Sequence, residues 1–106
     1  MIAVLGAGES GVGAATLAIS KGYDVFVSDI GEIKEVFQKQ LNKNGIEWEQ
    51  GKHTEERILN AEMLVKSPGI PETILIVKAR AKGIEVLSEI EFAFRYTKGK
   101  IIAITG

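Results

Sequence analysis

Three glycines near the start of the chain have the spacing of a loop that binds phosphate groups. In the stretch VLGAGESGVG, Gly6, Gly8 and Gly11 form the pattern G-x-G-x-x-G between an apolar run and a segment of small residues. In such a loop the first glycine permits a tight turn, the second lets a diphosphate approach the backbone, and the third lets helix and strand pack closely. The N–H groups of the first helical turn then favour an anion. We expect a branched side chain at Gly8 to block the diphosphate and to strain the turn.

Two polar residues inside this loop bear on the same chemistry. Ser10 adds a hydroxyl donor beside the backbone N–H groups. Glu9 is discordant, because its carboxylate would repel a diphosphate unless the side chain points outward and only the backbone serves the ligand. A tight strand-to-helix turn that binds no ligand is the alternative interpretation of the whole loop.

Asp29 follows the next apolar stretch, DVFVS, where a dinucleotide-binding domain carries an acidic residue. There it would accept hydrogen bonds from a ribose, so these residues alone indicate a protein that binds a nicotinamide dinucleotide. A strand-end aspartate that caps the following helix is an almost equally simple interpretation.

A second loop, KSPGIPE, contains both prolines of the chain. Pro68 fixes its own backbone angle, Gly69 can adopt positive φ, and Pro71 suits the first turn of a helix. Ser67 is a further hydroxyl donor. The stretch is either a simple strand-to-helix turn or a stiff wall of a ligand site. Its expected place opposite the glycine loop favours the second interpretation.

Composition and charge argue against several other kinds of chemistry. Thirteen basic and fourteen acidic residues give a net charge of −1, so we expect no general attraction to nucleic acid or to an anionic membrane. The chain has no cysteine, and we expect His53, its single histidine, to be a solvated side chain rather than a metal ligand. Trp48, Phe92 and Phe94 are expected to be packing residues. A start without a basic leader predicts a cytoplasmic protein, and no catalytic acid–base pair can be assigned.

The elements that must position these residues alternate along the chain. Strands are expected at 2–5, 24–28, around Ile46 and Trp48 at a sheet edge, and at 63–65, 85–87 and 101–104. Helices are expected at 10–21, from Ile30 to Asn44, and at 54–59, 73–82 and 89–96. This alternation predicts an α/β fold, a Rossmann-like parallel sheet flanked by helices on both faces. The loops after the first, second and fourth strands then share one crevice.

Four sequence blocks, taken in order, are similar to a known family. GAGESG, then SD, then KSPGIP, then SEIEFAFRYTKGKIIAITG resemble the N-terminal domain of the Mur ligases over the whole chain. The resemblance implies that the crevice holds the UDP part of a UDP-muramoyl peptide rather than a dinucleotide. Within the family, the blocks resemble most the member that joins D-glutamate to UDP-N-acetylmuramoyl-L-alanine with ATP and magnesium.

The resemblance also implies roles for individual residues. It implies that Gly8, Glu9, Ser10 and Gly11 bind the uridine and the diphosphate. Asp29 and Ile30 would contact the uracil end. Ser67, Pro68 and Gly69 would border the diphosphate and the sugar. Family members can carry Thr-Arg after the strand-end aspartate, whereas Ile30-Gly31 supplies neither a side-chain donor nor a cation. Uracil contacts must then come from backbone and packing. No ligand role follows for the block SEIEFA.

The resemblance implies a domain organisation as well. Thr105-Gly106 matches the first letters of an ATP-binding loop, T-G-x-N-G-K-[ST]. Residues 1–98 are therefore expected to form the UDP-sugar-binding domain, and 99–106 the linker and first strand of an ATP-binding domain. D-Glutamate, ATP and magnesium would bind through further domains. The chain alone is expected to be a monomer that binds without catalysis, with no cofactor of its own.

Two alternatives remain open. A nicotinamide-binding domain of a dehydrogenase or of a regulatory module is supported by Asp29 but not by SPGIP. A sibling Mur ligase that adds a different amino acid would share every block, because the choice of amino acid belongs mostly to a C-terminal domain.

Overall fold

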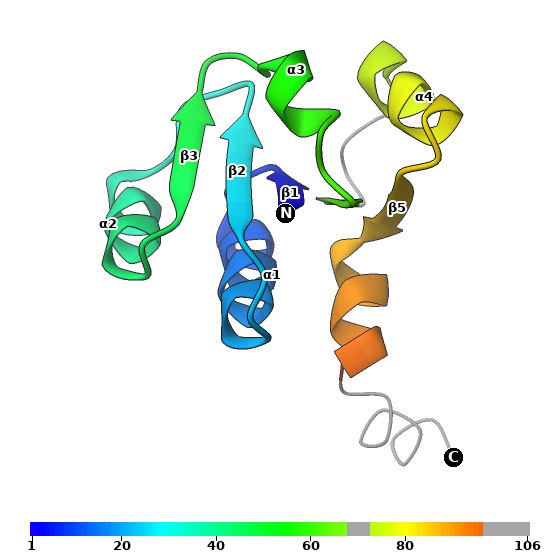
Figure 1. The fold of residues 1–106 in the computed structure, drawn as a ribbon. Helices are drawn as coiled ribbons and strands as arrows, with labels where there is room; N and C mark the ends of the chain where they lie inside the picture. The colour runs from blue at the N-terminus through cyan, green and yellow to red at the C-terminus, as the bar shows by residue number, and fades with distance from the viewer. Residues whose placement is uncertain (68–72, 97–106) are drawn as a thin grey trace.

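The computed structural model describes residues 1–67 and 73–96 (Figure 1). The strands are β1 (Ile2–Leu5), β2 (Val25–Asp29), β3 (Glu47–Gln50), β4 (Met63–Lys66) and β5 (Glu85–Ser88). The helices are α1 (Glu9–Ser20), α2 (Glu35–Lys43), α3 (Glu55–Ile58), α4 (Ile74–Ala81) and a further helix at residues 89–96. The predictions for Pro68, Gly69, Pro71, the strand at 101–104, Thr105 and Gly106 lie outside the described residues.

The strands form one parallel sheet in the order β3-β2-β1-β4-β5. This is the doubly wound order, in which the chain first builds outward from β1 to one edge and then continues from β4 to the other. The predicted α/β Rossmann-like fold is confirmed, as is the edge position of the strand that contains Trp48. The order reverses between β1 and β4, and in doubly wound sheets a crevice that binds ligands lies at such a reversal, beyond the carboxyl ends of the strands.

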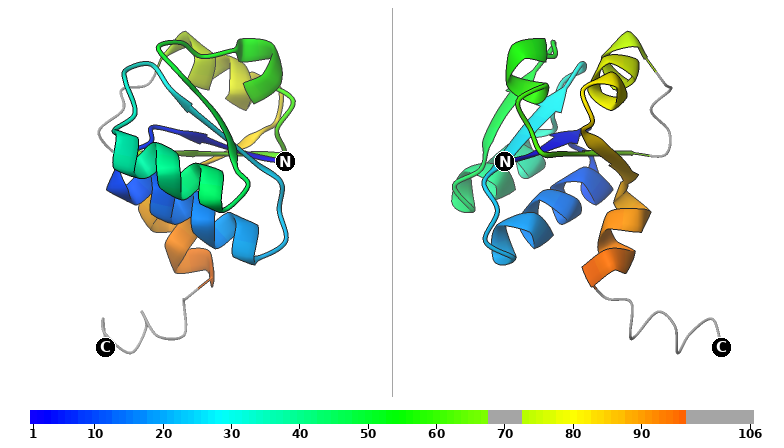
Figure 2. Two further views of the ribbon diagram at one scale, coloured as in Figure 1. Left: turned by 90° about the vertical axis from the view of Figure 1, so that its left-hand side faces the viewer. Right: turned by 45° about the vertical axis from the view of Figure 1, so that its right-hand side comes forward.

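Apolar side chains alternate along the strands and so build a core on each face of the sheet. In β1, Ile2 and Val4 join one core, whereas Ala3 and Leu5 join the other. The first core is covered by α1, α2 and the helix at 89–96, and the second by α3 and α4 (Figure 2). Helices therefore flank both faces, as predicted. In the described part of the chain, no helix has the length and apolar character needed to cross a bilayer.

The helix predicted to begin at Ile30 begins five residues later, at Glu35. The Asp29 carboxylate accepts a hydrogen bond from the N–H of Gly31, which turns the chain at the end of β2. Ile33 is buried before the helix begins, and Phe37 and Leu41 pack on the core as the periodicity predicts. Ile30 is 66% exposed, so it is not part of the buried helix face to which its spacing assigned it.

The aromatic residues expected to be packing residues divide into two groups. Phe92 is completely buried, and Trp48 packs against the core while its indole N–H donates to Asn42 Oδ1 at 2.9 Å. Phe94 is 41% exposed, so its assignment was wrong. Two residues apart on a helix, Phe92 and Phe94 point in widely different directions, and only Phe92 reaches the sheet.

Candidate functional site

A crevice of about 940 Å³ opens where β1, β2 and β4 end. It is lined by seven of the predicted site residues: Gly8, Glu9, Ser10, Gly11, Asp29, Ile30 and Ser67. The described lining is completed by Gly6 and Ala7 of the glycine loop and by residues at or just before the starts of α3, α4 and the last helix: His53, Glu55, Thr73, Ile74, Leu75 and Glu89. The structure thus places the glycine loop, the end of β2 and Ser67 after β4 around one cavity, of a size that suits a nucleotide-sized ligand.

The glycine loop owes its shape to two of its glycines. Gly6 has φ +97°, a conformation that favours glycine. A Cβ added to Gly11 would lie 1.9 Å from the carbonyl oxygen of Gly6, so only glycine permits this contact between helix and loop. Gly8 has φ −80° and ψ −167°, and a Cβ there would meet no atom within 4 Å. The strain expected from a side chain at Gly8 is therefore wrong, because the backbone is extended and the space beside it is open.

The first turn of α1 presents its N–H groups at this open space. Gly8 is the N-cap residue, and no side chain caps the helix. The N–H groups of the first turn have no carbonyl partner within the helix, and the helix dipole adds positive potential at the same end. Glu9 and Ser10 are exposed. The carboxylate of Glu9 therefore keeps its contact with water, which is the condition under which we expect the backbone alone to serve an anion.

Asp29 ties the glycine loop to the connection that follows β2. Its Oδ2 accepts the N–H of Ala7 and its Oδ1 accepts the N–H of Gly31, each at 2.9 Å. The interpretation as a helix cap was wrong, because α2 begins at Glu35 with Lys34 as its N-cap. Each carboxylate oxygen can accept a second hydrogen bond, so Asp29 braces two walls of the crevice and can still meet a ligand.

His53 is held in a polar network, and the expectation that it would be a solvated side chain was wrong. Its Nδ1 lies 2.6 Å from Oγ of Ser28, a completely buried residue of β2. Ser28 Oγ also lies 2.8 Å from Glu49 Oε2 and 3.1 Å from the carbonyl oxygen of Lys52. Because a hydroxyl has one proton, donation from Ser28 to Glu49 fits a His53 whose Nδ1–H donates to Ser28. The network holds the imidazole in the wall of the crevice.

Glu49 anchors the loop that carries His53. One oxygen accepts the Thr54 N–H at 2.7 Å, and the other accepts the Thr54 hydroxyl at 2.6 Å. Partial burial works to raise the pKa of Glu49, but the hydrogen bonds from Thr54 and Ser28 outweigh it and lower the pKa. The Thr54 side chain is thus engaged by Glu49 and does not cap α3.

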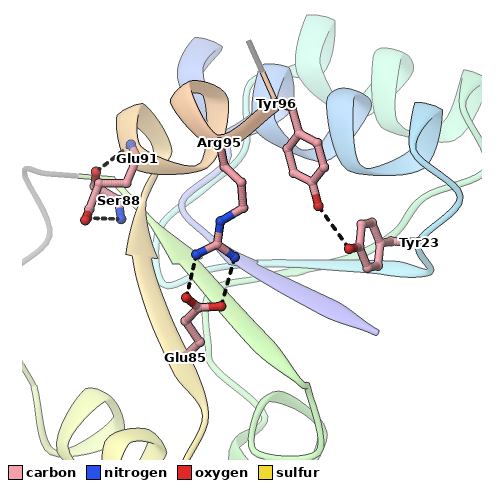
Figure 3. A network of polar contacts seen from close by, with 6 residues as sticks. All are labelled: Tyr23, Glu85, Ser88, Glu91, Arg95 and Tyr96. Carbon is pink, nitrogen blue, oxygen red and sulfur yellow. Dashed lines mark hydrogen bonds and ion pairs between the residues drawn. The ribbon is translucent and has the colours of Figure 1, made fainter. Parts of the chain in front are cut away.

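The helix at 89–96 begins with a capping box (Figure 3). The Ser88 hydroxyl oxygen accepts the N–H of Glu91, and a Glu91 carboxylate oxygen accepts the N–H of Ser88, each at 3.0 Å. The signal for this motif, S-x-x-E, is present in the sequence within SEIE. The block SEIEFA thus has a structural role in starting this helix.

Two polar contacts, drawn in Figure 3, and the packing of Phe92 dock this helix on the domain. The guanidinium of Arg95 donates to both carboxylate oxygens of Glu85, at 2.9 and 2.5 Å, and this hydrogen bonding lowers the pKa of Glu85. The Tyr96 hydroxyl donates to that of Tyr23 at 2.9 Å. Phe92 is buried in the core and meets the Tyr96 ring edge-on, with 5.1 Å between ring centroids. Strand, helix and core together fix the orientation of this segment.

We expect Ser88→Ala to lower the free energy of unfolding by about 1 kcal/mol, because it removes the hydroxyl that caps the helix. Amide hydrogen exchange in the first turn of the helix at 89–96 should become faster. Ser20→Ala is the matched control, because the Ser20 hydroxyl donates to the Leu17 carbonyl within the last turn of α1 and caps no helix N-terminus. Equal stability of the two variants in urea unfolding would contradict the capping role.

Glu89 is a crevice residue for which the sequence pattern indicates no role. Its side chain is 7% exposed, and within the described residues neither carboxyl oxygen makes a hydrogen bond of standard geometry, although the Ser67 side chain lies close to the carboxyl group. Its Oε2 lies 3.4 Å from the position that a Cβ on Gly11 would occupy. Burial raises the pKa of Glu89, and the Ser67 side chain beside it works in the opposite direction with smaller effect.

Comparison with known proteins decides the family. Residues 1–88 match the family described as "Mur ligase MurD-like, N-terminal domain". The chain belongs to this family. It is 58% identical over 106 residues to the UDP-N-acetylmuramoylalanine–D-glutamate ligase of Bacteroides fragilis and 43% identical to that of Chlorobaculum parvum. These matches cover 99% of this chain but 24% and 22% of the relatives, so the chain spans about a quarter of their length.

Solved structures of Mur-type ligases have the same fold as this domain. The UDP-N-acetylmuramate–alanine ligase of Thermotoga maritima matches with a TM-score of 0.77 at 23% identity, over 92% of this chain and 22% of that one. A pseudomurein peptide ligase type C from Methanothermus fervidus matches with a TM-score of 0.74 at 26% identity, over 90% of this chain and 20% of that one. The resemblance inferred from the sequence blocks is confirmed at the level of family and fold.

The crevice of this Mur ligase domain is poor in cations. None of the described residues that line it is a lysine or an arginine, whereas four are acidic: Glu9, Asp29, Glu55 and Glu89. Within 1–67 and 73–96, no three His, Cys, Asp or Glu side chains gather closely enough to hold a metal ion. An anionic ligand must therefore be met here by backbone N–H groups, by hydroxyl groups and by the dipole of α1.

Proposed function

We propose that this chain binds the UDP part of UDP-N-acetylmuramoyl-L-alanine within an ATP-dependent ligase that adds D-glutamate during peptidoglycan synthesis in the cytoplasm. One observation carries the proposal. The glycine loop, the end of β2 and Ser67 meet around one crevice, in a chain 58% identical to a relative named for that reaction.

The geometry supports a division of the ligand along the crevice. The diphosphate would lie over Gly8, where the space is open, and would accept hydrogen bonds from the first turn of α1 and from Ser10. The uracil would pack on Ile30, which is 66% exposed in the wall of the cavity. Burial of this apolar surface would stabilise the complex without a side-chain donor from Ile30-Gly31.

The described residues do not fit ATP with magnesium. A phosphate-binding loop for ATP needs a lysine at the β- and γ-phosphates, and no lysine lines the crevice among the residues described. We therefore assign ATP, magnesium and D-glutamate to other domains of the ligase, with residues 99–106 as the connection to the ATP-binding domain. The length of the relatives supports this division, since the chain spans about a quarter of them.

Titration with two ligands tests the proposal. UDP-N-acetylmuramoyl-L-alanine should bind the 106-residue chain more tightly than NAD, because only the UDP compound should also fit the loops that follow β2 and β4. Amide NMR signals of Gly8, Ser10, Ile30 and Ser67 should shift together on titration. Tighter binding of NAD through the same signals would support the nicotinamide alternative and contradict the proposal.

A further inference from the structure

Glu89 is a buried acid in the wall of an anion site, and nothing in the proposed binding mode uses it. We propose that Glu89 contacts the bound UDP-sugar as a neutral carboxylic acid, donating a hydrogen bond to a diphosphate oxygen, so that the ligand binds the protonated form of this residue. This inference rests on the proposed function, because it needs a diphosphate in the crevice. It adds a ligand contact from the SEIEFA block, whose role is otherwise structural.

The carboxyl group lies where a diphosphate would be placed. Glu89 lines the main crevice together with Gly8 and Ser10, and it also lines an adjoining cavity of about 380 Å³. Its Oε2 is 3.4 Å from the Cβ position of Gly11, directly beside the first turn of α1. The N-terminus of α1 and the carboxyl group thus lie next to each other at the same crevice.

The segment that carries Glu89 is held firmly. The capping box fixes the start of the helix, the Arg95–Glu85 pair joins the helix to β5, and Phe92 anchors it in the core. These contacts fix the backbone that carries Glu89, and the side chain on this backbone is 7% exposed.

Burial without a hydrogen-bond partner favours the neutral form of a carboxyl group. Removal of a carboxylate from water costs several kcal/mol unless the charge is paired, and the group instead shifts its pKa and takes up a proton. For Glu89 the direction agrees, because burial raises its pKa. Within the described residues neither oxygen has a hydrogen bond of standard geometry, and the Ser67 hydroxyl beside the carboxyl group can act as a donor to it, so an acid proton on Glu89 can still be donated to a ligand.

Acidic side chains predominate among the charged residues that line the crevice with Glu89. Glu9 on α1, Asp29 at the end of β2 and Glu55 on α3 line the same crevice, and each disfavours a further negative charge. His53 is the basic side chain among the lining residues that the structure describes. The remaining charges close to Glu89 in sequence are already engaged or lie elsewhere: Glu91 in the capping box, Arg95 on Glu85, and Lys66, which does not line the cavity.

The protonation state decides whether Glu89 attracts or repels the ligand. A diphosphate oxygen only accepts hydrogen bonds, and an ionised carboxylate also only accepts them, so the two repel each other. A protonated carboxyl has one O–H and can donate a short, strong bond to the anion. If the acid is ionised in the free domain, ligand binding must take up a proton. Affinity then falls with rising pH, by up to about tenfold per pH unit.

Binding of UDP-N-acetylmuramoyl-L-alanine to the 106-residue chain, measured by calorimetry between about pH 5.5 and about pH 8, tests this inference. The diphosphate of this ligand is esterified at both ends, so it does not titrate in that range. Wild-type affinity should fall as pH rises. Glu89→Gln should keep the affinity that the wild type has at low pH, within about threefold, because the amide N–H donates in place of the acid. Its pH profile should be flat.

Two control variants separate Glu89 from its neighbours. Glu9→Gln removes an exposed carboxylate from the same crevice, and its ligand affinity should depend on pH as the wild-type affinity does. His53→Gln should also keep most of that dependence, and it is needed because an imidazolium would give a pH dependence of the same sign. A pH dependence that disappears in His53→Gln and persists in Glu89→Gln would overturn the inference.

Other outcomes would overturn it in other ways. Affinity that rises with pH, together with weak binding by Glu89→Gln, would identify an ionised Glu89 that accepts hydrogen bonds from the sugar. If the affinity of Glu89→Gln depends on pH as that of the wild type does, Glu89 has a purely structural role. Failure of the folded wild type to bind at any pH would refute the proposed function and this inference with it.

Discussion

Gly11→Ala is expected to lower the free energy of unfolding by about 3 kcal/mol or more. A Cβ at this position would lie 1.9 Å from the Gly6 carbonyl oxygen and 2.9 Å from its carbon. Both atoms belong to the backbone of the glycine loop, so no side-chain rotation relieves the clash. Either α1 must move away from β1, which opens the core, or the loop must change shape. Urea unfolding followed by circular dichroism measures the loss.

Gly13→Ala provides the matched control on the same helix. Gly13 is exposed, and a Cβ there would meet no atom within 4 Å. Alanine is a better helix former than glycine by up to about 1 kcal/mol, so this variant should be as stable as the wild type or more so. Similar stability of Gly11→Ala and Gly13→Ala would mean that helix and loop do not make this close contact.

Gly8→Val is expected to abolish binding of the UDP-sugar while the domain stays folded. The loss should exceed about a hundredfold, or about 2.7 kcal/mol, because the isopropyl group would fill the space that the diphosphate needs over the first turn of α1. Valine fits the extended backbone at this position, and a Cβ there meets no atom within 4 Å. Replacement of a glycine N-cap should cost at most about 1 kcal/mol of stability. NMR titration with UDP-N-acetylmuramoyl-L-alanine measures the binding.

Gly8→Ala is an intermediate variant, in which a smaller side chain should cause a smaller loss of binding. Its single methyl group should weaken binding by less than valine does, since part of the space remains open. A wild-type pattern of amide signals in both variants would exclude unfolding as the cause. If Gly8→Val binds the ligand as tightly as the wild type, the diphosphate does not lie over this loop, and the proposed binding mode is wrong.

The local signals in the sequence are sufficient for most of the fold. Apolar runs such as Ile2–Leu5 predict buried parallel strands, and the glycines at Gly22 and Gly83 follow helix ends where positive φ is needed. Because parallel strands require crossovers of one hand, the alternation alone implies that the loops after β1, β2 and β4 meet. The start of α2 was misplaced because Ile30 has helical spacing, whereas Asp29 turns the chain through a hydrogen bond to Gly31.

The glycine loop could also be interpreted from the sequence, for the same reason. Gly6 permits the turn through its positive φ, and Gly11 permits the close contact with the Gly6 carbonyl. Both roles involve residues a few positions apart, so the spacing of the glycines is enough to predict them. The capping box at Ser88 and Glu91 is equally local and could have been recognised from S-x-x-E. Interactions between residues that are close in the sequence can therefore be predicted from the pattern of residue types.

Only the tertiary structure decided the chemistry of the polar residues. His53 is positioned by Ser28 and Glu49, and the bond to Ser28 joins residues 25 positions apart in the chain. Asp29 uses both oxygens on backbone N–H groups, one of them in the glycine loop 22 positions away. Glu89 becomes a buried acid because the last helix lays it against Gly11. Burial and charge surroundings set a pKa, and both arise only when distant segments pack together.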